Sequence, residues 1–257
     1  MSTKRKGQNR KIKDCYKLTL LRIKITMQKI FSFKIKLIAV ISCVILCALT
    51  ITGVFAVKTF NESKVLTVVI DAGHGGIDGG ASGVNTGVRE SDINLLIAKE
   101  LKKRYENAGF NVVMVRESDV GLYGDESKGF KLRDLEKRVE IINGCGGDFL
   151  VSVHLNVYSS PSRRGAQAFY KKGDKHGEIL AKKIQGRING LGVVPRLYDA
   201  LYGDYYLLNN SKIPSVIVEC GFLSSPEDEK LLISSSYREQ IASAIYSGSL
   251  DALVSFN

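Results

Sequence analysis

The chain has 257 residues, and its 44% hydrophobic content is enough for one substantial core. Its formal charge of +11 comes from residues 1–36, which hold twelve Lys or Arg and a single acid, Asp14. Because the rest of the chain holds 25 basic and 25 acidic residues, the net charge gives no support for a nucleic-acid partner, and none is expected.

The N-terminal part is predicted to cross a membrane. Residues 37–57 carry no charge, and 21 residues at about 1.5 Å each can span the roughly 30 Å hydrocarbon core. Basic residues before the span and a neutral region after it place residues 1–36 in the cytoplasm and the rest of the chain outside. A secretory signal cleaved after Ala56 is the alternative, but the long leader favours an uncleaved anchor, followed by a connection at residues 58–65.

From residue 66 onward, apolar runs alternate with helical stripes. The helix predicted at residues 92–108 places five side chains on one stripe: Ile93, Leu96, Ile97, Leu101 and Tyr105. Such alternation predicts a single α/β domain at residues 66–257, with a twisted, parallel-rich mixed sheet flanked by helices on both faces. The predicted strands are 66–70, 110–115, 149–153, 165–170, 205–208 and 215–219, and the predicted helices are 92–108, 131–142, 175–189 and 237–254, with a short helix from Pro226.

Polar side chains follow three of the predicted strands directly. His74 follows the first strand within a glycine-rich turn, His154 follows the run Leu150–Val153, and Glu219 follows the last apolar run. Parallel strands that end at one edge of a sheet deliver their terminal residues into one crevice, where open α/β sheets bind ligands. Glu90, just before the helix predicted from Asp92, is expected to lie opposite the two histidines.

Two imidazoles and a carboxylate, with a fourth position open to water, are a donor set typical of zinc hydrolases. We therefore expect one Zn²⁺ ion, held by His74, Glu90 and His154. Such a site brings a bound water toward a pKa of about 7, and Glu219 is the candidate general base for that water.

Each candidate also has a purely structural interpretation. In this interpretation the role of Glu90 is to stabilise a helix N-terminus, and His154 is a hydrogen-bonded core histidine. Glu219 could be a structural carboxylate at a strand end, although a charge after an apolar run is costly unless it is paired or coordinated. The third histidine, His176, is expected on the surface.

Four ordered motifs resemble the zinc-dependent N-acetylmuramoyl-L-alanine amidases of the amidase-3 type, over about residues 66–254. The resemblance implies His74, Glu90 and His154 as zinc ligands, Glu219 as the catalytic glutamate, and hydrolysis of the amide between the lactyl group of N-acetylmuramic acid and L-alanine. Ala72 and Ser225 depart from the family's usual proline and asparagine, but neither position supplies a ligand. The motifs are Asp71-Ala72-Gly73-His74-Gly75-Gly76, Glu90 before a helix, Ser152-Val153-His154-Leu155-Asn156, and Glu219-Cys220-Gly221-Phe222-Leu223-Ser224.

Within that family, the membrane segment, the bare catalytic domain and the segment Gly203–Leu208 are similar to the sporulation amidases, which help create muramic-δ-lactam in spore cortex peptidoglycan. This similarity implies an extracytoplasmic catalytic domain on the forespore or cortex side, held at the membrane by residues 37–57. No carbohydrate-binding repeat accompanies the domain, so an exported accessory protein is expected to assist it on peptidoglycan.

Two other functions stay open at this point, a catalytically silent peptidoglycan-binding or regulatory module and a zinc exopeptidase. Three arginines, Arg89, Arg133 and Arg138, are candidates for a stem-peptide carboxylate, although such side chains are more often structural. Cys145 and Cys220 could form a disulfide, but two small buried hydrophobic residues are the preferred interpretation.

Overall fold

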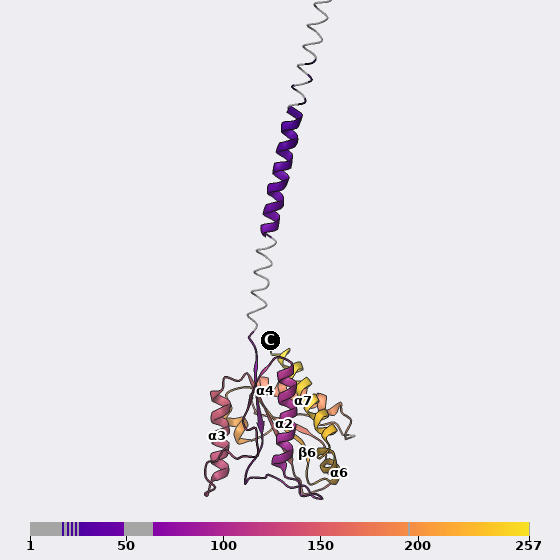
Figure 1. Ribbon diagram of the computed structural model, residues 1–257. Coiled ribbons are helices and arrows are strands. Elements are labelled where there is room, and N and C mark those ends of the chain that lie inside the picture. The colour runs from indigo at the N-terminus through magenta and orange to yellow at the C-terminus, as the bar shows by residue number, and fades with distance from the viewer. Residues whose placement is uncertain are drawn as a thin grey trace, which may run out of the picture. The chain divides into compact units, whose positions relative to one another are not determined.

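The computed structural model describes residues 17, 20, 22, 24, 26–48, 64–194 and 196–256. The chain divides into two compact units, Met1–Lys64 and Val65–Asn257, and the second contains every strand of the sheet (Figure 1). The unit boundary falls within the connection predicted at residues 58–65.

The first unit contains the helix Thr26–Ala48, which is long and apolar enough to cross a membrane. It includes residues 37–48 of the predicted span but begins at least eleven residues earlier than residue 37. The predicted span begins at residue 37 because Lys29, Lys34 and Lys36 are charged. These lysines do not end the helix, since lysine is a good helix former. Residues 49–57, including the alternative cleavage position after Ala56, lie outside the described residues.

The second unit is built on one six-stranded sheet in the order β2-β1-β3-β6-β4-β5. Every neighbouring pair is parallel except β4 and β6, so the predicted parallel-rich mixed sheet is confirmed. All eight residues of β6 are buried, as expected for a strand covered on both faces. The strands are β1 (Thr67–Ala72), β2 (Asn111–Met114), β3 (Phe149–Asn156), β4 (Gln167–Tyr170), β5 (Leu201–Tyr202) and β6 (Ser215–Phe222).

Helices cover both faces of this sheet. Helices α2, α7 and α4 pack side by side over one face, whereas α3 and the short α5 contact each other over the other (Figure 1). The larger hydrophobic cluster lies under the three-helix layer and a smaller one lies under α3. The helices are α2 (Glu90–Asn107), α3 (Phe130–Gly144), α4 (Lys175–Asn189), α5 (Tyr206–Asn210), α6 (Pro226–Leu232) and α7 (Ser235–Leu253).

Local signals account for several helix ends. Asp174 and Ser225 accept hydrogen bonds from the first-turn amides of Gly177 and Asp228, which satisfies N–H groups that would otherwise be unpaired. Pro226 then occupies the first turn of α6, where its fixed φ and missing N–H are tolerated.

Two details of the sequence-based prediction were wrong. Residues 205–208 do not form a strand, because the strand is β5 and Tyr206 begins α5. Leu207 and Leu208 are both buried, which a helical turn allows but the alternation of a strand disfavours. Leu96 is 43% exposed, because the buried stripe of α2 follows every fourth residue from Ile93.

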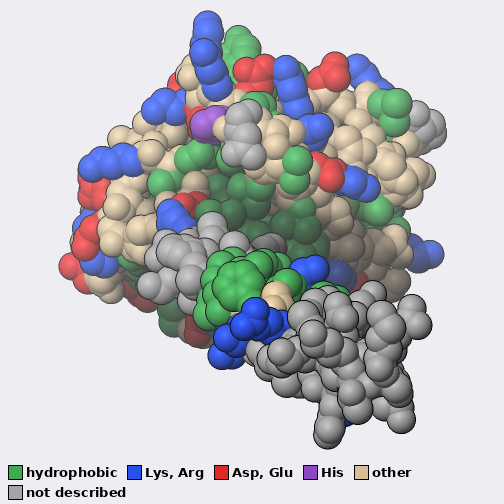
Figure 2. Space-filling view, turned by 90° about the horizontal axis from the view of Figure 1, so that it is seen from above, with side chains coloured by type: hydrophobic (Ala, Val, Ile, Leu, Met, Phe, Trp, Pro, Cys, Tyr) green, Lys and Arg blue, Asp and Glu red, His purple; other side chains and the backbone are tan. Residues whose placement is uncertain are grey.

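The surface of the second unit matches its balanced composition. On the face that Figure 2 shows, Lys and Arg side chains alternate with Asp and Glu instead of gathering in one basic patch. Inside the unit, Cys220 is fully buried, Cys145 packs beside the smaller cluster, and both are free thiols, in agreement with the preferred interpretation of these two residues.

Candidate metal site and catalytic glutamate

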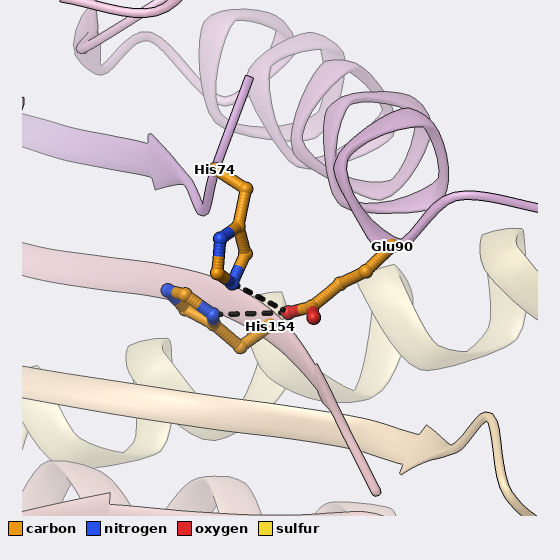
Figure 3. Close-up of side chains that lie close together, drawn as sticks. All are labelled: His74, Glu90 and His154. Atoms are coloured by element: carbon orange, nitrogen blue, oxygen red, sulfur yellow. Dashed lines mark hydrogen bonds and ion pairs between the residues drawn. The ribbon is translucent and has the colours of Figure 1, made fainter. Parts of the chain in front are cut away.

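Three of the predicted site residues converge at the carboxyl ends of β1 and β3. His74 lies on the loop after β1, Glu90 is the first residue of α2, and His154 lies near the end of β3 (Figure 3). One possible ligand atom from each lies within 4.8 Å of the other two. His74 Nε2 is 3.3 Å from Glu90 Oε1, and His154 Nδ1 is 3.1 Å from the same oxygen.

The loop after β1 makes this convergence possible because its backbone approaches the site closely. His74 itself has a φ of 62°, in the left-handed region that histidine adopts more often than most residues with a side chain. A Cβ atom on Gly73 would overlap the imidazole of His154, and one on Gly80 would overlap the Glu90 carboxylate. At these two positions glycine leaves the space that the ligand side chains occupy.

Further contacts orient the three side chains. Asp78 Oδ2 lies 2.8 Å from His74 Nδ1, and its other oxygen pairs with Lys131 Nζ at 3.1 Å, so Nε2 of His74 is the nitrogen that faces Glu90. Glu90 accepts hydrogen bonds from the backbone amides of Ala81 and Leu155. A carboxylate behind a ligating histidine is a common arrangement in metal sites, because it fixes the ring and its tautomer.

The electrostatics of the cluster also suit a cation. Burial opposes protonation of His74, but hydrogen bonds to Asp78 and Glu90 outweigh it and raise the pKa of the imidazole to about 9. Burial would raise the pKa of the Glu90 carboxyl group, but hydrogen bonds and charge interactions with His154 and His74 outweigh this effect and lower the pKa. Without a metal the cluster therefore gathers protons around a buried carboxylate. A zinc ion could replace those protons, and the donor types fit it.

Glu219 lies beside this cluster, and its carboxylate has few hydrogen-bond partners. It occupies β6 in register with His154 on β3 and is 6% exposed. Its Oε2 atom is buried and has no hydrogen-bond partner among the described residues. Burial raises the pKa of Glu219, against the opposing influence of His154. A buried carboxylate oxygen without a partner is costly, and such groups are characteristic of catalytic positions.

Tyr205 is the neutral neighbour of Glu219, and it lines the same pocket as His74 and His154. A hydrogen-bonding interaction between its hydroxyl and Glu219 lowers the pKa of the carboxyl group, although burial still dominates. The ring lies 5.4 Å from that of Phe169 and close against Gly203, where a Cβ atom would overlap it. These contacts place the phenol beside the carboxylate.

A buried network of ion pairs stabilises the loop that carries His74. Arg138 is 2% exposed and binds Asp71 at 2.6 Å and Asp134 at 2.5 Å. The same guanidinium donates to the carbonyl oxygens of Ala72 and His74, at 2.8 and 2.6 Å. The network therefore fixes the backbone on which His74 is mounted.

The placement of the three arginines favours the structural interpretation. Arg138 is buried in the network and cannot meet a substrate carboxylate. Arg133 binds Asp125 at 2.7 Å, and Arg89 binds Asp119 at 3.2 Å as well as the carbonyl oxygen of Gly76. All three therefore have partners within the protein.

Sequence reasoning identified the four clustered residues but did not assign roles to Asp78 or Tyr205. Asp78 follows His74 by four residues in an irregular loop, and only the loop conformation brings the two side chains together. Tyr205 was assigned to a strand, which hid its proximity to Glu219. His176 is exposed as expected and stacks on Phe256, with ring centroids 4.6 Å apart.

A single α/β domain that carries two histidines and two glutamates at the carboxyl edge of its sheet has the arrangement of a hydrolase built around a metal ion. The model of the N-acetylmuramoyl-L-alanine amidase family (Amidase_3) matches residues 68–250, and the chain belongs to this family. The match includes all four residues of the cluster.

Relatives and solved structures agree with this assignment. The germination-specific N-acetylmuramoyl-L-alanine amidase of Bacillus subtilis (strain 168) is 36% identical, over 71% of this chain and 78% of the relative. The CwlD amidase from Clostridioides difficile, solved in complex with the GerS lipoprotein, is 37% identical with a TM-score of 0.71, covering 74% of this chain and 99% of that one. An N-acetylmuramoyl-L-alanine amidase from Clostridium difficile 630 is 32% identical with a TM-score of 0.67, covering 76% and 100%. The predicted amidase-3 type enzyme is confirmed.

Proposed function

We propose that this enzyme is zinc-dependent, with His74, Glu90 and His154 as the ligands of one ion and Glu219 as the general base. The observation that carries the proposal is the convergence of three donor atoms within 4.8 Å, beside a buried Glu219 oxygen that has no partner among the described residues. The bond hydrolysed is the amide between the lactyl group of N-acetylmuramic acid and L-alanine in peptidoglycan.

In this proposal the metal ligands and Glu219 have different roles in the hydrolysis. When bound, the zinc ion supplies Lewis acidity, which polarises the scissile carbonyl and lowers the pKa of a water toward about 7. Glu219, whose carboxyl pKa is raised by burial, accepts a proton from the attacking water and passes it to the departing nitrogen of L-alanine. The water oxygen bonds to the lactyl carbonyl carbon and the C–N bond breaks, leaving a lactyl carboxylate and a free L-alanine amine.

The direct test compares the purified full chain with Glu219→Gln. We expect bound zinc in both proteins, and at least about a 100-fold lower rate of peptidoglycan cleavage in the variant, because a positioned proton carrier contributes that much or more. Mass analysis of the products should show free stem peptides and peptide-free muramic acid. Glu136→Gln, an exposed position on α3, is the matched control and should keep full activity.

The other functions predict different products. Amino acids released from the ends of stem peptides would indicate a zinc exopeptidase. Zinc-free protein without cleavage would indicate a silent peptidoglycan-binding or regulatory module. Equal activity of Glu219→Gln and the wild-type protein would reject Glu219 as the base.

We also propose the cellular setting. Residues 66–257 are the catalytic domain, which residues 37–57 hold outside the cytoplasmic membrane, with residues 1–36 inside. The apolar helix Thr26–Ala48 and the basic leader support this arrangement. The similarity to a germination-specific amidase supports a role in spore cortex, on the forespore or cortex side, where muramic-δ-lactam is formed. Absence of muramic-δ-lactam from the cortex of a strain lacking this protein would be the supporting result.

An exported accessory protein is the partner that we propose for the catalytic domain. The support is that the CwlD amidase was solved together with the GerS lipoprotein. Its test is the rate of glycan cleavage by the purified chain, with and without proteins of the sporulating cell envelope. Full activity of the chain alone would contradict the proposal.

A further inference from the structure

A second cavity opens at the same edge of the sheet as the metal cluster. This groove has a volume of about 780 Å³. Asn156, which lines it, follows His154 by two residues on β3, and Phe222, at the end of β6, follows Glu219 by three. Gln167, another lining residue, pairs directly with Glu219 across β4 and β6. The groove therefore starts beside the candidate catalytic carboxylate.

Two of the arginines that line the groove lie over the same aromatic ring. The guanidinium of Arg163 lies 4.6 Å from the ring centre of Tyr198 and 5.5 Å from that of Phe222. The guanidinium of Arg196 lies 5.5 Å from the centre of the same Tyr198 ring. Stacking on aromatic rings fixes a planar guanidinium while leaving its edge free for hydrogen bonds.

Neither of these two arginines takes part in an ion pair among the residues that the structure describes. Arg163 makes one side-chain hydrogen bond, from Nη2 to Gln167 Oε1 at 2.9 Å. Their neighbour Arg164 differs, because its Nε lies 3.2 Å from the buried Asp228 carboxylate. Two positive side chains that line one groove without an acidic partner among the described residues attract an anion, which offsets their mutual repulsion.

A carboxylate is the anion that suits this arrangement. Guanidinium groups bind carboxylates through two parallel hydrogen bonds, and contact with an aromatic ring reduces the entropy that such a group loses in doing so. Of the two parts of peptidoglycan, the stem peptide carries free carboxylates along its length, whereas the N-acetylated sugar rings are uncharged. The stem peptide is released from the amide that a water activated by Glu219 is proposed to attack, and the groove starts beside Glu219.

We propose that the groove is the stem-peptide subsite, in which Arg163 and Arg196 bind a carboxylate of the residues that follow L-alanine. The inference rests on the proposed amidase function and adds the feature of the substrate that the enzyme selects. It assigns this task to Arg163 and Arg196, because Arg89, Arg133 and Arg138 are committed to structural partners.

The test uses the zinc-loaded full chain and two muropeptides, one with free stem carboxylates and one in which these groups are amidated. We expect the wild-type protein to cleave the free acid with at least about a tenfold higher kcat/KM, the ratio that one charge-assisted hydrogen bond supports. Arg163→Gln and Arg196→Gln should each raise KM for the free acid and reduce the preference, and the double variant should abolish it. Arg187→Gln, whose partner is Asp251 on α7, is the matched control and should retain the preference.

A second measurement separates this inference from the proposed function. Calorimetry measures the affinity of the Glu219→Gln protein for the free-acid stem peptide. Adding Arg163→Gln to this protein should weaken the affinity about tenfold, and adding Arg163→Lys, which keeps the charge, should weaken it less. If the wild-type protein cleaves neither muropeptide, with or without proteins of the sporulating cell envelope, the proposed function fails and this binding comparison alone decides the subsite. Unchanged peptide binding in the Arg163→Gln background, or a full preference in the double variant with a normal unfolding temperature, would overturn the inference.

Discussion

The ring nitrogen of His74 that faces away from Glu90 is held by the carboxylate of Asp78. Asp78 holds one ring nitrogen at 2.8 Å, and Lys131 in turn pairs with the second oxygen of Asp78. The other ring nitrogen, Nε2, lies 3.3 Å from Glu90 Oε1. Asp78 therefore acts as a positioning residue for the proposed zinc ligand.

Asp78→Asn is expected to weaken zinc binding by about 10- to 100-fold, the usual cost of removing a carboxylate behind a ligating histidine. The affinity can be measured by competition with a chelating dye, without reference to activity. Asp119→Asn is the control, because Asp119 accepts a hydrogen bond from Gly76 in the same loop. An equal loss in both variants would mean that loop order, and not the His74 contact, governs binding.

Tyr205 has a comparable relation to Glu219. Its hydroxyl interacts with the Glu219 carboxylate, whose Oε2 atom has no hydrogen-bond partner among the described residues. A general base must keep its reactive oxygen aimed at the water throughout the reaction, so a fixed neighbour benefits turnover more than substrate binding.

Tyr205→Phe should lower kcat by about tenfold, since a hydrogen bond to a charged group contributes at least about 1.5 kcal/mol, and should leave KM and zinc content unchanged. Tyr206→Phe, at the adjacent and 38% exposed position, should match the wild-type protein in all three. Steady-state kinetics on a soluble muropeptide gives both constants. A wild-type kcat in Tyr205→Phe would remove this role from Tyr205.

At the scale of elements, α3 stabilises the loop after β1 through Arg138. The pair between Arg138 and Asp71 is almost fully buried, with exposures of 2% and 1%. Burial alone would raise the pKa of Asp71, but Arg138, together with His154 and Ser152, outweighs it and lowers that pKa. A carboxyl group with a depressed folded-state pKa stabilises the fold above its unfolded pKa, and this stability is lost as the pH falls through the folded pKa.

Arg138→Met should therefore reverse the contribution of Asp71. Without Arg138 the pKa of the buried carboxyl rises above its unfolded value, so Asp71 destabilises the fold at pH 7 and is relieved as acid protonates it. We expect a loss of about 3–5 kcal/mol in the free energy of unfolding at pH 7, narrowing toward pH 4. Urea unfolding with a chelator present measures this loss without a contribution from zinc.

Arg133→Met on the same helix is the control for that loss. Arg133 pairs with Asp125 at the surface, where solvent screens the interaction, so a much smaller change is expected. A loss in Arg138→Met that is independent of pH would show that the hydrogen bonds to Ala72 and His74, and not the charge of Asp71, dominate.

The elements also show why part of the site could be predicted. His74, His154 and Glu219 each end an apolar run, and parallel pairing brings such ends together whatever the loops do. Glu90 was placed within two residues of the true start of α2. The partners Asp78, Tyr205 and Arg163 lie on irregular segments, whose positions depend on individual loop dihedral angles that no periodic pattern encodes.

The same limit explains the errors at the edge of the sheet. β5 has only two residues and α5 only five, so neither is long enough for a period of two or 3.6 to emerge from the sequence. The groove that contains Arg163 and Arg196 is lined by residues next to such segments. Its existence therefore became apparent only from the structure.

At the scale of the whole molecule, the net positive charge and the proposed catalytic residues lie in different parts of the chain. The excess of positive charge lies in residues 1–36, while the charges of the remaining chain balance. A basic segment before an apolar helix is the pattern that orients a membrane anchor, and an enzyme that acts on cell wall needs its catalytic domain on the outer side. The prediction for the whole molecule is therefore that the N-terminal part stays attached.

The full chain should remain in the membrane fraction after an alkaline wash, and mass analysis should find residues 1–56 still present. Ala56→Leu, which would block cleavage at that position, should leave this distribution unchanged. Placing two charges in the helix, as Ile41→Lys with Val44→Lys, should release the chain or prevent its export, since a lysine at the membrane centre costs about 2.5–3.5 kcal/mol. If the wild-type protein is instead soluble and begins at Val57, and Ala56→Leu alone is retained, the segment is a cleaved signal, and any membrane proximity of the enzyme must come from its partner.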